Sequence, residues 1–231
     1  MTLVIDPRFH GPPASANGGY AAGRLAGFVD ADTVEVTLRA PPPLGRELRV
    51  ERTGDGAATL HDGDVLVAEA RPGRLDLDVP APVPFEEAAA AGERFPFRDD
   101  HPFPTCFVCG PQREAGDGLR IFTGPARDVH AGAWTPDGSL AGPDGVVAPE
   151  YVWAALDCPS CTPVADPGVP ILLGRITARL EGEVRAGEPH VVVAWPLEVD
   201  GRKRRAGAAL FTAGGERRGV AEALWIEVRS S

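Results

Sequence analysis

Hydrophobic and polar residues alternate along several stretches of the chain. In the first half, DTVEVTLRAPPPLG, RELRVERTGDG and GAATLHDGDVLVAEARPG follow this pattern: Val34, Val36 and Leu38 alternate with polar residues, as do Leu48 and Val50. A period of two is typical of half-buried β-strands. The preceding stretch, NGGYAAGRLAGFV, predicts a helix, so the first half contains a helix followed by three strands.

The second half repeats this order. PEYVWAALDC predicts a helix, and ILLGRITARLEGEVRAGE, PHVVVAWPLEVDG, RKRRAGAALFTAGG and RGVAEALWIEV predict strands. PPPLGRELRVE also resembles EVRAGEPHVVV, and DVLVAEA resembles RGVAEAL. We infer a tandem duplication. The helices are too few for a parallel sheet of βαβ units, which indicates an α+β fold with antiparallel strands.

The 24 prolines and 28 glycines lie mainly between these periodic stretches, where they indicate turns and linkers. The stretch richest in them, from Val79 to Thr105, separates the halves and contains FEEAAAAGERF, a candidate short helix. The predicted organisation is a first copy at 1–80, a proline-rich linker at 81–105 and a second copy at 106–231.

Three glycines of the first predicted helix have four-residue spacing. Gly19, Gly23 and Gly27 therefore share one helix face, where another backbone can approach closely. The segment is short and contains Asn17 and Arg24, which argues against a membrane helix. We expect it to lie tightly in the hollow of a curved sheet.

The net charge of -10 and sequence pI near 5.0 argue against nucleic-acid and anionic-membrane partners, which select clustered Lys and Arg. No stretch approaches the roughly 20 apolar residues that span a bilayer. The first residues, MTLVIDPRFHGPP, lack the pattern of a secretion signal, so we expect a cytoplasmic protein without membrane contact.

A helix wrapped by a curved antiparallel sheet, duplicated in one chain, resembles the double hotdog arrangement of the thioesterase superfamily. The residues that carry the resemblance are NGGYAAG, CFVCG followed by GDGLRI, and APEYVWAALDC. The CFVCG…GL phrase is similar to a segment that precedes the hotdog domain in many small thioesterase-like proteins. The resemblance implies an acyl-CoA or related acyl-thioester as ligand. A duplicated hotdog chain can stand alone as a pseudo-dimer or pair further through its sheet edges as a homodimer, and the sequence leaves both open. We expect no cofactor.

In hotdog thioesterases, a glycine-bearing helix start polarises the thioester carbonyl, and a carboxylate about two turns along the helix activates water or attacks directly. The two groups of one site usually come from opposite halves of a dimer. Asn17, Gly18 and Gly19 match the helix start, with Asn17 where many relatives have His. The carboxylate position of this half falls near Ala26, so the acid is missing there.

The second half has the opposite deficiency. Asp157 falls where the carboxylate is expected, whereas the helix start reads Ala148, Pro149, Glu150 and has no glycine. The resemblance thus implies one hybrid catalytic site, with Asn17, Gly18 and Gly19 from the first copy and Asp157 from the second.

These groups suit thioester hydrolysis. Negative charge develops on the carbonyl oxygen, and free N–H groups at a helix start point to such a charge. A carboxylate beside an apolar wall, for which Trp153 and Tyr151 are candidates, serves as base or nucleophile. The sequence leaves these two roles open.

Structural interpretations stand beside the catalytic ones. Asn17 with its glycines is also a typical N-cap with close packing, and Asp157 is also compatible with a solvated or capping position. Glu150, in the first turn of its helix, is more consistent with a surface residue that suits the helix dipole than with a catalyst.

A basic run starts one predicted strand. It suits the phosphates of coenzyme A, which Arg and Lys recognise, and it equally suits a solvated turn. The run consists of Arg202, Lys203, Arg204 and Arg205.

The function that these observations favour is hydrolysis of an acyl-CoA or related thioester. A non-catalytic acyl- or lipid-binding module is the main alternative. A hydratase or dehydratase is less favoured, because His10 is the only histidine near either predicted helix. No G-x-S-x-G motif indicates a serine hydrolase, and no glycine-rich loop fits the strand-to-helix context of nucleotide binding.

The four cysteines form two C-x2-C pairs, Cys106 with Cys109 and Cys158 with Cys161. Without a secretion signal, such cysteines are thiols or metal ligands rather than disulfides. Two such pairs are compatible with a tetrahedral zinc site. The pairs lie about fifty residues apart, however, so we expect buried thiols that act as small hydrophobes and no metal.

Overall fold

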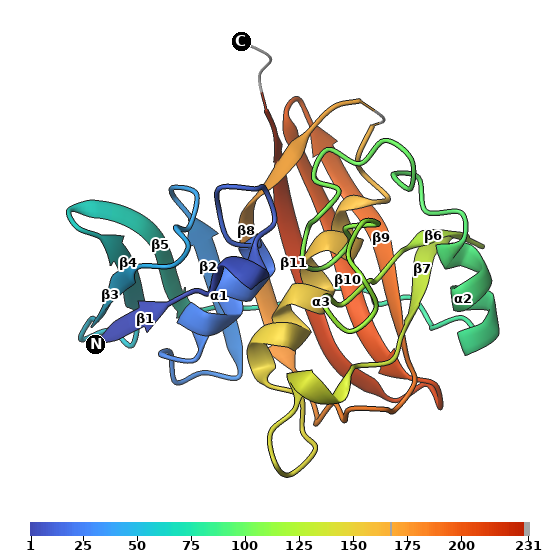
Figure 1. The fold of residues 1–231 in the computed structure, drawn as a ribbon, viewed down its shortest axis with the longest axis horizontal. Helices are drawn as coiled ribbons and strands as arrows, with labels where there is room; N and C mark the ends of the chain where they lie inside the picture. The colour runs from blue at the N-terminus through green and yellow to red at the C-terminus, as the bar shows by residue number, and fades with distance from the viewer. Residues whose placement is uncertain (167, 229–231) are drawn as a thin grey trace.

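The computed structural model describes residues 1–166 and 168–228, which form one continuous antiparallel sheet with helices packed against it (Figure 1). The first half contributes β1 (Thr2–Val4), β2 (Thr33–Leu38), β3 (Glu47–Arg52), β4 (Ala58–Asp62) and β5 (Val65–Pro72). The second half contributes β6 (Gly124–Ala126), β7 (Val129–Trp134), β8 (Ile171–Leu180), β9 (His190–Asp200), β10 (Lys203–Thr212) and β11 (Arg217–Glu227). The helices are α1 (Gly18–Ala26), α2 (Phe85–Gly92) and α3 (Pro149–Cys161), with short 3-10 turns at Pro7–Phe9 and Gly138–Leu140.

The strand order shows the duplication directly. The sheet runs β1-β3-β4-β5-β2-β8-β11-β10-β9-β7-β6. The order β3-β4-β5-β2 of the first half corresponds to β9-β10-β11-β8 of the second, and β1 borders β3 as β7 borders β9. β2 and β8 pair antiparallel and join the halves edge to edge. The fold class expected from the sequence, α+β with two tandem copies, is thus observed.

The third predicted strand of the first half is in fact a hairpin. GAATLHDGDVLVAEARPG forms β4 and β5, which pair from Ala58↔Ala70 to Asp62↔Val65. The turn between them contains Gly63 at a φ of +58°, a conformation that glycine adopts without steric cost. The short strands β1, β6 and β7 lie outside the stretches that alternation identified.

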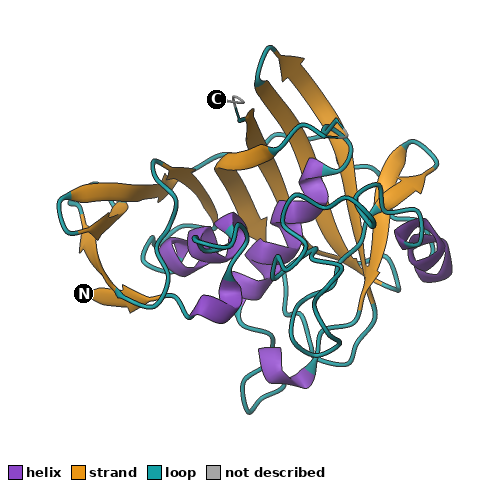
Figure 2. Ribbon diagram, turned by 45° about the horizontal axis from the view of Figure 1, so that its top comes forward, coloured by secondary structure: helices purple, strands orange, loops and turns teal. Residues whose placement is uncertain are grey.

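α1 and α3 lie next to each other on one face of the sheet (Figure 2). A Cβ atom at Gly19 would lie 2.3 Å from Asp157 Cβ, and one at Gly23 would lie 2.7 Å from Glu150 Cα. The expected close approach therefore occurs at these two glycines, and it brings the start of α1 to the later part of α3. At Gly27 the nearest atom to such a Cβ is Arg24 O at 3.7 Å, so this glycine is not part of the contact.

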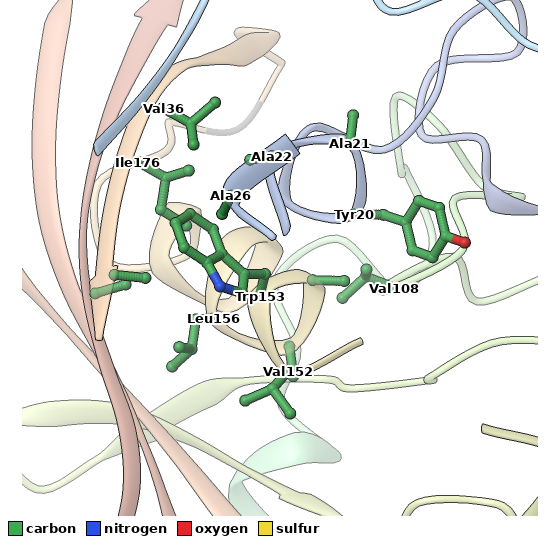
Figure 3. Close-up of a cluster of buried hydrophobic side chains, with 14 of the residues drawn as sticks. Tyr20, Ala21, Ala22, Ala26, Val36, Val108, Val152, Trp153, Leu156 and Ile176 are labelled. Atoms are coloured by element: carbon green, nitrogen blue, oxygen red, sulfur yellow. The ribbon is translucent and has the colours of Figure 1, made fainter. Parts of the chain in front are cut away.

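The core lies between the two helices and the sheet. Trp153 projects from α3 toward Ala26 and Ile176, while Leu156 lies on the same side of the helix (Figure 3). Leu156 and Ile176 are fully buried. Complete burial of such an aliphatic side chain stabilises a fold by roughly 1.5–3 kcal/mol.

The proline-rich segment contains the short helix expected in FEEAAAAGERF. Ala88 and Ala91 of α2 pack against Val191 and Val193 of β9. The alternate residue Val192 belongs to the core cluster of α1 and α3, so α2 covers the opposite face of the sheet. No helix in the described part of the chain combines the length and apolar character needed to cross a membrane.

Candidate functional site

A cavity of about 480 Å³ lies where the start of α1 meets the later part of α3. Its volume is within the range of about 300–1,000 Å³ common for small-molecule sites. The walls are mostly apolar. They come from both copies and from the segment before β6, which is residues 93–123 between α2 and β6. The lining includes Ala16, Asn17, Gly18, Leu38, Phe95, Phe97, His101, Phe103, Cys106, Cys109, Ile121, Asp157, Cys158, Cys161, Ile171, Leu172, Leu173 and Trp225.

Asp157 is the buried carboxylate of this cavity, with 1% of its surface exposed. Its Oδ2 accepts hydrogen bonds from Gly19 N–H at 2.8 Å and from Asn17 Nδ2 at 3.0 Å. Its Oδ1 is buried and has no partner among the described residues. Burial raises the pKa of Asp157 to about 7, although the bonds from Gly19 and Asn17 act in the opposite direction.

Asn17 connects the helix start with this carboxylate. Its Oδ1 accepts a hydrogen bond from Tyr20 N–H at 2.9 Å, which is the N-cap interaction of α1. Its Nδ2 donates to Asp157 Oδ2 and also to Cys158 Sγ at 3.4 Å. The two sequence interpretations of Asn17 are therefore compatible, since one side chain caps the helix and contacts the acid.

Gly18 presents the free N–H of the helix start. It lies at the first position of α1, where the N–H has no intrahelical acceptor, and no other acceptor is found for it in the described residues. Gly18 lines the cavity, whereas the N–H of Gly19 is occupied by Asp157. A Cβ at Gly18 would lie 2.9 Å from Leu173 Cδ2, so glycine lets Leu173 pack directly against the start of α1.

The pseudo-equivalent position at the start of α3 lacks these groups. Ala148 precedes α3 without a side-chain cap, and Glu150 forms an ion pair with Arg24 at 3.7 Å. Ala26 has no carboxylate to face this helix start. The polar arrangement is therefore present on one side of the α1–α3 contact.

The other sequence-based candidates lie elsewhere. Trp153 packs against Gly23, and Tyr151 joins the aromatic rings of Phe9 and Tyr20; neither is among the described cavity-lining residues. His10 Nδ1 lies 3.2 Å from Gly11 O, also outside the lining. The apolar wall of Asp157 is thus made by other residues than the two expected.

The basic run is largely paired with acids. Arg204 contacts Asp166 at 2.8 Å and Glu227 at 3.1 Å. Arg205 contacts Glu198 and Glu222, at 2.9 and 2.6 Å. Of the remaining two residues, Arg202 donates to the backbone carbonyl of residue 227 at 3.4 Å, and Lys203 is exposed at the start of β10.

The structure brings together three thiols that the sequence placed far apart. The sulfur atoms of Cys106, Cys109 and Cys158 lie within 4.8 Å of one another, and all three residues are buried. His101 Nε2 lies 3.2 Å from Cys109 Sγ. This is the group of described residues best suited to hold a metal ion. The repeated C-x2-C spacing was the signal for it, and His101 had no sequence signal.

No family model matches the chain, and no curated protein sequence matches it. Several solved structures are similar to the chain. The tesB protein of Mycobacterium avium subsp. paratuberculosis is 15% identical, with a TM-score of 0.59 over 93% of this chain and 88% of that one. The acyl-CoA thioesterase II TesB2 of Mycobacterium marinum is 10% identical, with a TM-score of 0.57 over 87% and 81%.

A protein of Alicyclobacillus acidocaldarius with the hot dog fold is 11% identical, with a TM-score of 0.59 over 100% of this chain and 93% of that one. Near-complete coverage and the repeated strand order show that this chain has the α+β double hotdog fold. The expectation drawn from the resemblance is confirmed at the level of the fold.

Proposed function

We propose that the protein hydrolyses an acyl-CoA or a related acyl-thioester. The observation that carries this proposal is the buried, unpartnered Oδ1 of Asp157, a residue that lines an apolar cavity together with Gly18, whose N–H also has no partner among the described residues. Two proteins with this fold are named as a tesB protein and an acyl-CoA thioesterase II, which supports the same chemistry. Catalytic residues from both copies make one site, so a single chain contains both halves of it.

In the proposed reaction, the thioester carbonyl oxygen lies against Gly18 N–H at the positive end of the α1 dipole. A water molecule between the thioester carbon and Asp157 loses a proton to Oδ1 and attacks that carbon. The tetrahedral oxyanion is stabilised by the Gly18 N–H; one donor of this kind contributes about 10²- to 10³-fold in rate. The C–S bond then breaks, and the proton passes from Asp157 to the departing thiolate.

Asn17 and Gly19 act on this reaction through Asp157. Both donate to Oδ2, so the carboxylate has one oxygen fixed and the other free for the water molecule. This geometry favours a general base over a nucleophile, because the carboxylate is held in place by its two donors rather than free to approach the carbonyl carbon.

The acyl group is proposed to lie along the apolar wall formed by side chains such as Leu38, Phe97 and Leu173. Of the basic run, Arg202 and Lys203 are the residues that we retain as coenzyme A contacts, because Arg204 and Arg205 already have carboxylate partners. Lys203 pairs in the sheet with Ile226, which itself pairs with the cavity-lining Leu172.

A panel of acyl-CoA substrates of increasing chain length tests the activity. We expect release of free thiol that depends on the protein, with the best rates for chains that the cavity of about 480 Å³ accommodates. Calorimetric titration with the same compounds measures their binding to the protein. Binding without thiol release across the panel would contradict hydrolysis and favour the alternative, a non-catalytic acyl-binding module.

A further inference from the structure

The three buried thiols beside the cavity form a cluster that the proposed hydrolysis does not use. Cys106 and Cys109 come from the segment before β6, and Cys158 comes from α3. The residues are 3%, 6% and 8% exposed, and Cys106 Sγ lies 3.8 Å from Cys158 Sγ. We propose that Cys106, Cys109 and Cys158 bind one zinc ion as thiolates. This departs from the expectation of no metal that the separation of the two cysteine pairs suggested.

The sulfur spacing fits tetrahedral zinc. Zn–S bonds of about 2.3 Å at a tetrahedral angle place two sulfur atoms about 3.8 Å apart. The observed distance of 3.8 Å between Cys106 Sγ and Cys158 Sγ equals this expected sulfur–sulfur distance. Cys109 Sγ lies within 4.8 Å of both. Bound zinc therefore requires only a small movement of Cys109. The metal binds thiolates, so binding releases the remaining thiol protons to solvent.

A tight turn from Cys106 to Gly110 holds the first two cysteines close together. Gly110 N–H donates to Cys106 O at 2.9 Å, and a Cβ at Gly110 would lie 2.5 Å from Cys106 N, so the tight turn requires glycine.

Two side chains outside the cluster donate to its sulfur atoms. Asn17 Nδ2 lies 3.4 Å from Cys158 Sγ, and His101 Nε2 lies 3.2 Å from Cys109 Sγ. His101 Nδ1 accepts the N–H of Phe103 at 2.9 Å, so the neutral ring has its proton on Nε2. His101 is therefore a donor to a ligand sulfur and not the fourth ligand. Such donors disperse the charge of three thiolates around one zinc ion.

All three cysteines line the cavity, so we expect the fourth coordination position to be open to it. Water or a small ligand in the cavity would occupy it. The ion would connect the segment that carries Phe103 and Cys106 to α3, and so would fix one wall of the cavity relative to the helix that holds Asp157.

Metal analysis of the full chain tests this proposal without any substrate, so its outcome is independent of whether the protein hydrolyses thioesters. Protein expressed with added zinc and freed of loosely bound metal should contain about one zinc per chain by elemental mass spectrometry. A thiol-specific mercurial should release the zinc to a colorimetric chelator. Cobalt substitution should give a near-ultraviolet sulfur-to-cobalt charge-transfer band and the visible bands of tetrahedral cobalt.

Variants assign the ligands. Cys106→Ser and Cys158→Ser should each lose the zinc, and the matched control Cys161→Ser should retain it, because Cys161 lies outside the group of three sulfurs. His101→Ala should retain zinc with about 10- to 100-fold weaker affinity, as expected for an outer-sphere donor.

Wild-type protein without zinc after expression with added zinc would overturn the proposal, even if the serine variants fail to fold. A Cys106–Cys158 disulfide in place of metal would also overturn it, as would loss of zinc in Cys161→Ser. Cobalt binding without the charge-transfer band would exclude thiolate ligands.

Discussion

The geometry of the site depends on two residues at the start of α1, a glycine that lets the two helices touch and an asparagine that contacts the buried acid. Gly19 is needed where α1 meets α3, since its N–H reaches Asp157 only because no Cβ separates the two helices. Asn17 satisfies Tyr20 N–H with one end of its amide and contacts Asp157 with the other. These contacts explain why an acid on α3 can remain buried beside the start of α1.

Gly19→Ala should destabilise the fold by about 1–3 kcal/mol, because its Cβ would overlap Asp157 Cβ and force the helices apart. The matched variant Gly27→Ala has a helical φ of -60° and no crowded contact, so it should be neutral or stabilise by about 0.4–1 kcal/mol. Urea unfolding measures both values. Equal effects of the two substitutions would contradict the close helix contact at Gly19.

Two substitutions of Asn17 distinguish its capping of α1 from its contact with Asp157. Asn17→Ala should destabilise by about 0.5–2 kcal/mol through loss of the N-cap and should also reduce kcat. Asn17→Ser keeps an N-cap oxygen but lacks the Nδ2 donor to Asp157, so it should regain most of the stability and little of the kcat. Thermal melts and initial rates measured on the same preparations check this. Recovery of both quantities in Asn17→Ser would show that Asn17 only caps the helix.

Alternation identified the first-half strands β2 and β3 because each has one face toward the core and one toward solvent. β9 shows why the pattern works only in part: Val192 and Ala194 face α3 while Val191 and Val193 face α2, so both faces are apolar and the strand reads as a continuous hydrophobic run. β1 and β6 are too short for a period to appear. The β4–β5 hairpin was marked by Gly63 and Asp64, a recognised two-residue turn.

Gly63→Ala tests that hairpin turn. Its φ of +58° is costly for any residue with a Cβ, so this substitution should destabilise by about 1–2 kcal/mol. Gly54, also in a first-half turn, has open space around it and no positive φ, and Gly54→Ala serves as the control. Chemical denaturation measures the free energy of unfolding of both variants. A Gly63→Ala protein as stable as the control would contradict a turn that needs a positive φ at residue 63.

In the whole molecule, the candidate site takes its residues from both copies. Asn17 and Gly18 could be placed at a helix start from the sequence, and the resemblance to hotdog proteins paired them with Asp157. Position in the chain could not show that Cys158 lies beside Cys106, because that contact depends on how the segment before β6 crosses over α3. Nor could it identify His101 or Phe97 as cavity walls, since these lie in irregular structure without periodicity.

The shared sheet and core predict cooperative unfolding. β2 pairs with β8 across the join, and one core cluster includes Leu25 and Val36 of the first copy with Leu156 and Ile176 of the second. Far-ultraviolet circular dichroism and tryptophan fluorescence should therefore report one coincident urea transition. All four tryptophans lie in the second half, so earlier loss of dichroism than of fluorescence would show that the first copy unfolds by itself.

The hydrolysis rate of Asp157→Asn with the best acyl-CoA is the most direct test of the central claim that one acid of the second copy works with the helix start of the first. The matched control is Glu150→Gln, a carboxylate on the same helix that pairs with Arg24 outside the cavity lining. We expect kcat to fall about 10²- to 10⁴-fold in Asp157→Asn, with acyl-CoA binding and the melting temperature retained, and to change little in Glu150→Gln. Near wild-type kcat in a folded Asp157→Asn protein would contradict this claim.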